Sequence, residues 1–393
     1  MRDAWEPLVT VLLVLAAAGL ALSTVCHVLV WLVVRHRPKP AVNSDSVTIL
    51  RPLCGVDACL TENLEACSRQ THSPLTLVLG VADMNDEALP VALRFCRENA
   101  QLSTRVSVGE DQRLENPKVA LLEKMSWQSE GQWLVVSDSN VRVPPDYVQH
   151  ALAHAAPDVG LITHLVAGCG GRTLGAFIEN LQLNCFVAPA VCGARFLAGQ
   201  TCVMGKSMFL RREALDAIGG FQSAGHFLAE DYVIGQAIVN AGYRVITAAR
   251  PVPAWHEGWT LSRFFGRHLR WAVMRRFVSR GAYVAELFLN PAPILLLLVV
   301  LGVLLPLPRG QLLWVAGAVL FTQLLDAITF TRMSGQRAPA LAVLCNPLRQ
   351  CFTLGIWILG WFIETVEWRG KTYGVGTGSM LRPAASPVPV RAR

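Results

Sequence analysis

Charged residues are scarce in this 393-residue chain: Asp, Glu, Lys and Arg make up 16% of it, whereas hydrophobic residues make up 52%. Soluble domains carry about 25% charged residues, so the shortage indicates that part of the chain lies in lipid. The charge that is present is mainly basic, with a formal net charge of +7. The length leaves room for one sizeable core together with membrane segments, or for two small domains.

The 11 cysteines lack the spacing of a metal site or a disulfide framework. Cys54, Cys59, Cys67 and Cys96 are scattered, and the sequence has no CxxC pair and no Cys/His cluster at zinc spacing. We therefore expect reduced and mostly buried thiols in a reducing compartment. A repeat architecture is not indicated either, because no self-similarity recurs at a period of 20–50 residues.

A long uncharged stretch lies near the N-terminus. Residues 8–34 carry no fixed charge, and about 20 apolar residues suffice to cross a bilayer. The apolar core of a cleaved signal peptide would be only about 7–15 residues long. Arg35, Arg37 and Lys39 follow directly, and flanking basic residues mark the cytoplasmic side of a span. The sequence predicts a membrane anchor over residues 1–35 that leaves the following residues in the cytoplasm.

The next two hundred residues alternate between strand and helix patterns. Such alternation favours an α/β fold, with a mostly parallel sheet flanked by helices on both faces. We therefore expect one cytosolic domain over residues 45–260. Asn116 followed by Pro117 has the chemistry of a helix N-terminus. The strands expected in the first part of this domain cover residues 46–50, 75–81, 105–108 and 133–137, and the helices cover 60–70, 86–100, 117–129 and 144–155.

The last third of the chain returns to the membrane. An arginine-rich interfacial helix is expected over residues 261–283, and a C-terminal membrane region over 284–366. The last twenty residues, 374–393, are rich in Gly and Pro and are expected to form a flexible tail. The transmembrane helices of this region are predicted from three apolar stretches, at 287–305, 311–330 and 352–363.

Three spans after a cytosolic domain would place the C-terminus on the opposite side of the membrane. The alternative is that residues 338–363 re-enter the face from which they came, with a break at Asn346 and Pro347. The sequence leaves both arrangements open.

Two aspartates directly follow predicted strands: Asp83 comes after residues 75–81, and Asp138 comes after 133–137. In open parallel sheets, ligands bind beyond the carboxyl ends of the strands. Carboxylates repel phosphates but can bind them through a divalent metal. Asp83 could instead accept hydrogen bonds from a uracil or a ribose. Asp and Asn also gather in turns for local reasons, so a surface turn is the alternative for the D-x-N motif that Asp138 begins.

A third acidic site, formed by Glu230 and Asp231, opens a predicted helix. Carboxylates are favoured near the positive end of a helix dipole, so a purely local role is one interpretation. The functional interpretation is a general base. An inverting sugar transfer needs a carboxylate that accepts the proton of the acceptor hydroxyl.

The sequence RHLRW places Arg267 and Arg270 three residues apart, on one face of a helix. Fixed guanidinium groups are suited to stabilise the charge of a departing diphosphate. Trp271 would border such a site or lie at the lipid interface. Positive-inside anchoring accounts for the three further arginines of this stretch, Arg275, Arg276 and Arg280.

Several motifs occur together in one order: RPLCGVDACLTENLE, VADMND, ENPKV, VVSDSNVRVPPDY, CVMGKSMFLRREAL, FLAEDYVIGQAI and RHLRW. Together they resemble the ceramide glucosyltransferases, which belong to the inverting glycosyltransferases with a D, D, D, (Q/R)xxRW signature. The resemblance covers roughly residues 45–275. It implies a GT-A fold, a UDP-sugar donor, a divalent metal (Mg²⁺ or Mn²⁺) and β-glucosylation of the primary hydroxyl of ceramide.

The resemblance also implies roles for single residues. Asp83 would lie near the nucleotide, Lys118 near the diphosphate, and Asp138 at the metal and the diphosphate. Asp231 would be the catalytic base. The diphosphate and the donor sugar would be bound by the terminal signature, which consists of Arg267, Arg270 and Trp271.

Two departures from the family pattern affect the expected substrates. The second acidic motif ends in Asn140 rather than in an aspartate, so only Asp138 is a metal ligand by type. Residues 188–196 read APAVCGARF where the animal enzymes have a histidine-containing segment, HPRYY. A hopanoid or a diacylglycerol acceptor, or a different UDP-sugar, is therefore the alternative.

The expected partners are a UDP-sugar, a membrane lipid acceptor and the bilayer, and no nucleic acid. We expect a multi-pass membrane protein with its catalytic domain in the cytoplasm, in the inner membrane if it is bacterial. A different class remains open, a membrane transporter or scaffold whose cytosolic domain only binds nucleotide. That class predicts functional charge inside the membrane, for which Asp326 is the candidate.

Overall fold

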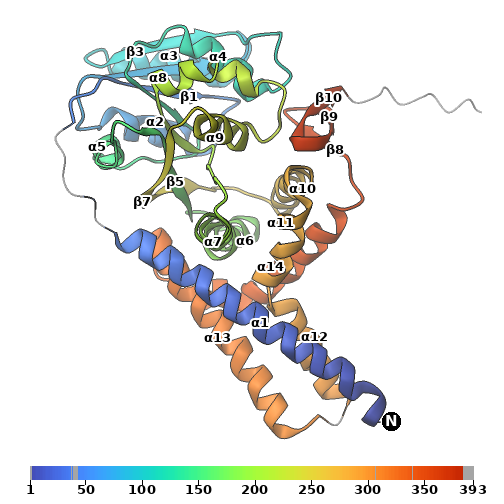
Figure 1. Cartoon of the computed structure of the whole chain (residues 1–393). Coiled ribbons are helices and arrows are strands. Elements are labelled where there is room, and N and C mark those ends of the chain that lie inside the picture. The colour runs from blue at the N-terminus through green and yellow to red at the C-terminus, as the bar shows by residue number, and fades with distance from the viewer. Residues whose placement is uncertain (1, 37, 39–42, 306, 339, 384–393) are drawn as a thin grey trace, which may run out of the picture.

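A computed structural model describes most of the chain, and Figure 1 shows its two parts: a sheet domain with helices on both faces, and a bundle of long helices below it. The long N-terminal helix of the bundle is α1 (Arg2–Arg35). The described residues are 2–36, 38, 43–305, 307–338 and 340–383.

The domain is built on a seven-stranded sheet with the order β3-β2-β1-β4-β6-β5-β7. Strand β6 is antiparallel to its neighbours β4 and β5, and the other pairs are parallel. The predicted mostly parallel sheet is therefore confirmed. Its strands are β1 (Val47–Pro52), β2 (Leu75–Val81), β3 (Ser103–Val108), β4 (Trp133–Ser137), β5 (Val159–Cys169), β6 (Ser207–Arg211) and β7 (Arg244–Trp255).

Each face of the sheet buries its own hydrophobic core. Successive strand residues point to opposite faces, so Ile49 joins one core and Leu50 the other. The Asn116 side chain accepts hydrogen bonds from the backbone N–H groups of Lys118 and Val119, which confirms the predicted helix start. One face is covered by α2 (Leu60–Ser68), α3 (Ala88–Glu98) and α5 (Tyr147–Leu152), and the other by α4 (Pro117–Ser126), α8 (Arg212–Ala217) and α9 (Glu230–Asn240).

Among the described residues, three helical segments are long and apolar enough to cross a membrane: 5–35, 174–198 and 309–334. A fourth crossing results if the bent pair 280–289 and 292–304 counts as one span. The first and third segments belong to α1 and to α13 (Arg309–Ser334), where we predicted spans. The bent pair consists of α11 (Arg280–Ala285), η3 (Glu286–Leu289) and α12 (Ala292–Leu304).

The segment 174–198 was not predicted. It consists of α6 (Leu174–Gln182), η1 (Leu183–Val187) and α7 (Ala188–Ala198), and 56% of its apolar window is buried inside the protein. Because this helix combines small and polar residues with apolar ones, its pattern is weaker than that of an ordinary span.

The third predicted C-terminal span is arranged differently from the other two. Residues 352–363 fall in and after α14 (Ala340–Leu359), which is not among the candidate spans of the described residues. Instead, Phe352 and Ile356 of this helix pack on α6 and on α10 (Leu261–Val278). The chain thus returns to the sheet domain after α14, which continues through Asn346 and Pro347 without the predicted break. The side of the membrane on which the C-terminus lies stays a prediction.

A small antiparallel sheet follows, which we call the C-terminal strap: β8 (Thr365–Trp368), β9 (Lys371–Val375) and β10 (Leu381–Pro383). It packs beside α10, and Leu381 donates a backbone hydrogen bond to His226 of the domain (Figure 1). The flexible tail predicted from residue 374 is therefore wrong for residues 374–383. Gly376 and Gly378 lie in the turn between β9 and β10, and Gly378 has the positive φ that favours glycine. The rest of that tail, 384–393, lies outside the described residues.

The carboxylate Asp326, in the candidate span of α13, connects three helices. On α13 it accepts hydrogen bonds from Asn346 (2.6 Å) and Arg349 (3.3 Å) of α14, and it lies 3.4 Å from the His27 ring of α1. The cavity beside it has a volume of about 10 Å³, which is room for about one water molecule. This volume is too small for a transported solute.

Candidate functional site

A cavity of about 1370 Å³ lies where the sheet domain meets α7, α10 and the C-terminal strap. Asp231 and Arg270 both line it, although the two residues come from different helices. Two of the three acidic motifs and RxxRW therefore line one cavity. The predicted site residues in the lining are Lys118, Asp138, Asp231, Arg267, Arg270 and Trp271.

Asp83 is the one predicted site residue that does not line this cavity. It follows β2 as expected, but its side chain is exposed and accepts a hydrogen bond from the Asn85 backbone N–H at 2.7 Å. This local turn is the chemistry that Asp offers after a strand. A nucleotide contact of Asp83 therefore stays a prediction.

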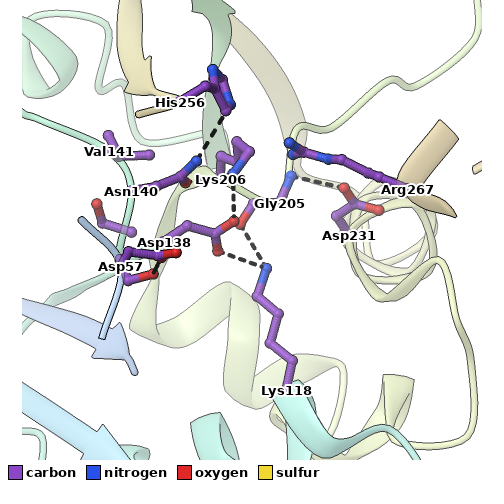
Figure 2. A network of polar contacts seen from close by, with 12 residues as sticks. Asp57, Lys118, Asp138, Asn140, Val141, Gly205, Lys206, Asp231, His256 and Arg267 are labelled. Carbon is purple, nitrogen blue, oxygen red and sulfur yellow. Dashed lines mark hydrogen bonds and ion pairs between the residues drawn. The ribbon is translucent and has the colours of Figure 1, made fainter. Parts of the chain in front are cut away.

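Asp138 follows β4 and is held between two ammonium groups (Figure 2). Lys118 Nζ lies 3.2 Å from its Oδ1, and Lys206 Nζ lies 3.1 Å from its Oδ2. Burial disfavours the charged carboxylate, but the two ammonium groups outweigh it and hold the pKa of Asp138 below its usual range. Asp138 is therefore an anion at neutral pH.

The two lysines respond differently to this environment. Burial opposes the charge of Lys118, but Asp138 and Glu230, whose carboxylate lies 3.0 Å away, outweigh it and raise its pKa. For Lys206, burial prevails over the attraction of Asp138 and lowers the pKa to about 8. Both side chains are cations at neutral pH.

Asp231 stands in the first turn of α9, and its carboxylate faces the loop before β6. Its Oδ2 accepts a hydrogen bond from the Gly205 backbone N–H at 2.7 Å, and its Oδ1 accepts one from Tyr232 N–H. Burial and the adjacent Glu230 charge raise the pKa of Asp231 to about 7. A carboxylate with this pKa can accept a proton near neutral pH. Gly205 allows this approach, since a Cβ at that position would lie 2.9 Å from Asp231 Oδ2.

Arg267 is fixed on α10 by a buried carboxylate and two indoles. Its Nη1 donates to Glu179 Oε1 at 3.0 Å, and its guanidinium lies 4.5 Å from the ring of Trp271 and 5.0 Å from that of Trp259. An arginine held in this way keeps its charge in place at low conformational cost. Trp271 thus borders the site and stacks on Arg267.

Arg270 approaches the cavity beneath the C-terminal strap. Its guanidinium lies 5.8 Å from the Trp368 ring, and it donates to the Glu367 carbonyl at 3.4 Å. Burial, followed by the charge of Arg267, lowers the pKa of Arg270 to about 10, so it stays charged at neutral pH. The strap therefore forms one wall of the site.

The remaining arginines of this stretch do not all serve as membrane anchors. Arg276 is buried, and it donates to the backbone carbonyl of Ile363 at 2.8 Å. Arg275 forms an ion pair with Glu286 at 2.6 Å. Positive-inside anchoring was therefore the wrong interpretation of Arg276, which instead holds the chain after α14.

Four side chains that build the site were not predicted from the sequence: Glu179, Lys206, Trp259 and Trp368. Lys206 is the one with a local signal, since it stands in the quoted motif CVMGKSMFLRREAL just before β6. The others come from α6, from the loop before α10 and from the strap. These residues are far in the sequence from the residues that they contact, so no local pattern indicated their role.

Metal binding at this site would depend on few protein groups. Within the part of the chain that the structure describes, no cluster of three or more His, Cys, Asp or Glu side chains could hold a metal ion. Asp138 and the Asn140 amide oxygen are hard donors that suit Mg²⁺ or Mn²⁺. A metal here would complete its ligands with phosphate oxygens and water.

Comparison with solved structures shows the fold class. A mannosyltransferase, PcManGT from Pyrobaculum calidifontis, solved in complex with GDP-Man and Mn²⁺, superposes with a TM-score of 0.53 at 15% sequence identity. The match covers 90% of this chain and 99% of that one. The chain therefore has the GT-A-type fold that we predicted.

The sequence comparison shows the family. The profile of Glycosyl transferase family 21 matches residues 11–381, and this chain belongs to that family. "Ceramide glucosyltransferase 3" of Caenorhabditis elegans is 24% identical over 246 residues, which are 61% of this chain and 52% of that protein. "Ceramide glucosyltransferase 1" of the same organism is 22% identical over 253 residues, which are 64% of this chain and 54% of that protein. The chain thus spans about half the length of these curated relatives.

Proposed function

We propose that this protein is an inverting lipid glycosyltransferase that transfers glucose from UDP-glucose to the hydroxyl of a membrane lipid, with ceramide as the first candidate acceptor. One observation carries the proposal. A single cavity is lined by the charged groups of Asp138, Asp231 and Arg270 and also by apolar side chains of α1 and α7. A water-soluble donor needs the first set, and an acceptor with hydrocarbon chains needs the second.

The apolar end of the cavity lies along the membrane helices. Leu22 and Cys26 of α1 belong to a candidate span, and they line the cavity together with Val191 and Leu197 of α7. A lipid that keeps its chains in the bilayer could therefore present its head group at Asp231. The segment APAVCGARF, which departs from the family pattern, supplies part of this wall, so it is suited to select the acceptor.

Asp231 is proposed as the general base. It accepts the proton of the acceptor hydroxyl while that oxygen attacks the anomeric carbon from the side opposite to the diphosphate. The new bond joins the acceptor oxygen to the anomeric carbon, and the bond from that carbon to the diphosphate oxygen breaks. The electron pair leaves with UDP, and the configuration inverts.

The charge that develops on the leaving diphosphate is stabilised by Arg267, Arg270 and Lys118, which are fixed before the reaction starts. Asp138 would hold the divalent metal, Mg²⁺ or Mn²⁺, whose contribution is to neutralise the diphosphate. Asp83 is proposed to contact the nucleotide. The basic residue Arg35 in the last turn of α1 supports a cytoplasmic orientation of the whole site.

The test is a product analysis with the full-length protein in membranes. Labelled UDP-glucose, UDP-galactose and UDP-N-acetylglucosamine are each supplied with ceramide, hopanoid or diacylglycerol, and lipids are analysed by mass spectrometry. We expect glucosylceramide. A glycosylated hopanoid or diacylglycerol would keep the reaction but correct the acceptor. If no donor yields a lipid product or releases UDP, the proposal is wrong.

The apolar wall gives a structural test of lipid binding. Ala190→Trp places an indole in the cavity and should raise the acceptor KM about tenfold, as expected from about 1–3 kcal/mol of overpacking. UDP affinity should stay unchanged, because Ala190 lies in the wall that faces the acceptor. Phe196→Trp is the matched control, since Phe196 is exposed on the same helix. Equal KM values in the two variants would contradict the placement of the acceptor.

A further inference from the structure

Lys206 occupies the position at which the second acidic motif would bind a cation. Its Nζ donates to Asp138 Oδ2 at 3.1 Å and to Asn140 Oδ1 at 2.7 Å. The residue is buried, with 8% of its surface exposed, and its ammonium points at the two oxygens (Figure 2). The first and third residues of the D-x-N motif therefore converge on one protein cation.

A metal ion would require the same two oxygens. Mg²⁺ and Ca²⁺ bind oxygen ligands at about 2.0–2.6 Å, and the Lys206 ammonium already donates hydrogen bonds to both oxygens. Two cations at the same pair of oxygens would also repel each other. Lys206 and a divalent metal are thus alternative occupants of the Asp138–Asn140 pair.

The backbone around Lys206 makes this placement rigid. Asp138 N–H donates to the Lys206 carbonyl at 3.3 Å, and Lys118 Nζ donates to the Gly205 carbonyl at 2.9 Å. Gly205 N–H is also the donor to Asp231. The segment before β6 therefore connects the proposed base, the second acidic motif and both lysines through hydrogen bonds.

An ammonium at this position can bind a diphosphate directly. Lysine binds phosphate oxygens as a point charge and has three N–H donors. Among the described residues, the hydrogen bonds of Lys206 Nζ go to two oxygens, Asp138 Oδ2 and Asn140 Oδ1. A third donor is therefore left for a phosphate oxygen. With Asn140 in place of an aspartate, the motif carries one negative charge, and the ammonium groups of Lys206 and Lys118 both contact it.

We propose that Lys206 is a donor-binding residue that supplies from the protein itself the positive charge at the second acidic motif, and that it competes with a divalent metal for the oxygens of Asp138 and Asn140. The proposal rests on the proposed function, because the diphosphate belongs to the UDP-sugar. It predicts that metal increases donor affinity only moderately in the natural chain and becomes necessary once the ammonium is removed.

The first experiment measures metal binding without nucleotide. Full-length wild type and Lys206→Met, which keeps the length of the side chain without its charge, are titrated with Mn²⁺, and free Mn²⁺ is followed by electron paramagnetic resonance. We expect at least tenfold tighter binding by the variant. Lys124→Met is the matched control, since Lys124 lies on α4 away from the cavity lining. Equal Mn²⁺ affinities of wild type and Lys206→Met would overturn the competition.

The second experiment measures UDP binding by calorimetry in EDTA and then in Mn²⁺. Wild type should keep its UDP affinity in EDTA within about threefold, whereas Lys206→Met should lose at least tenfold and recover it in Mn²⁺. If EDTA abolishes UDP binding by the wild type, the role of Lys206 is wrong. If no protein binds UDP under either condition, the proposed function fails, and the Mn²⁺ titration still decides the competition. Lys206→Gln repeats both measurements if the Met variant does not fold.

Discussion

Asp138 and Asp231 line the same cavity, yet their surroundings drive their protonation in opposite directions. Asp138 lies at the end of β4 between two ammonium groups, and they hold its pKa below the usual range. Asp231 opens α9 beside the Glu230 carboxylate, and burial with that charge raises its pKa to about 7. One residue type therefore provides a permanent anion and a proton acceptor in one site.

This difference shows that charge pairing, rather than burial, separates the two pKa values. Both carboxylates are partly buried, and burial alone would raise both pKa values. The Lys118 ammonium contacts Asp138 and Glu230 directly. Its link to Asp231 is indirect, because it donates to the carbonyl of Gly205, and the N–H of Gly205 donates to Asp231. Two acids whose pKa values are driven apart are the arrangement expected for separate catalytic duties.

The largest expected difference between the two acids is the loss of turnover on substitution of Asp231. Asp231→Asn should lower turnover by about 10²-fold or more, since general-base catalysis contributes about 10²–10⁴-fold. UDP affinity should persist, because the diphosphate groups are untouched. The melting temperature of the variant at pH 8 should equal or exceed that of the wild type. The raised pKa means that ionised Asp231 destabilises the folded state at this pH, and asparagine removes that cost. Asp216→Asn, on the exposed side of α8, is the control. Turnover close to that of the wild type would remove Asp231 as the base.

An intermediate effect is expected from the Arg270 guanidinium, which lines the same cavity as the two acids. Arg270→Ala should weaken UDP binding by about ten- to a hundredfold, since hydrogen bonds to charged groups contribute about 1.5–3 kcal/mol. Arg270→Lys should recover part of this loss. The measurement is UDP competition against the labelled donor, with Arg280→Ala as the exposed control on the neighbouring helix. Unchanged inhibition by UDP would place the diphosphate elsewhere.

The smallest effect is a shift of the pH profile. Turnover should fall as the pH drops through about 7, because Asp231 then takes up a proton and loses its capacity as a base. Glu230→Gln removes the neighbouring negative charge, so the pKa of Asp231 should fall and the acid limb should move to lower pH by up to about one unit. Glu213→Gln on α8 is the control. An acid limb that stays in place in Glu230→Gln would show that another group titrates.

The sequence alone determined the parts that depend on local chemistry. Alternating strand and helix patterns predicted the sheet, Asn116 and Pro117 predicted the start of α4, and the uncharged residues 8–34 predicted α1. The acids after β4 and at the start of α9 were visible because strand ends and helix starts have local signatures. In each of these cases, the residues that specify the feature are close together in the chain.

Only the tertiary structure decided what meets in the cavity. Lys206 reaches Asp138 across 68 residues, Glu179 reaches Arg267 across 88, and Glu367 reaches Arg270 across 97. The return of the chain through α14 and the order in residues 374–383 were likewise decided by packing against α10 and Leu228. Contacts between distant segments leave no periodic or spacing signal, because their geometry depends on how whole elements pack together.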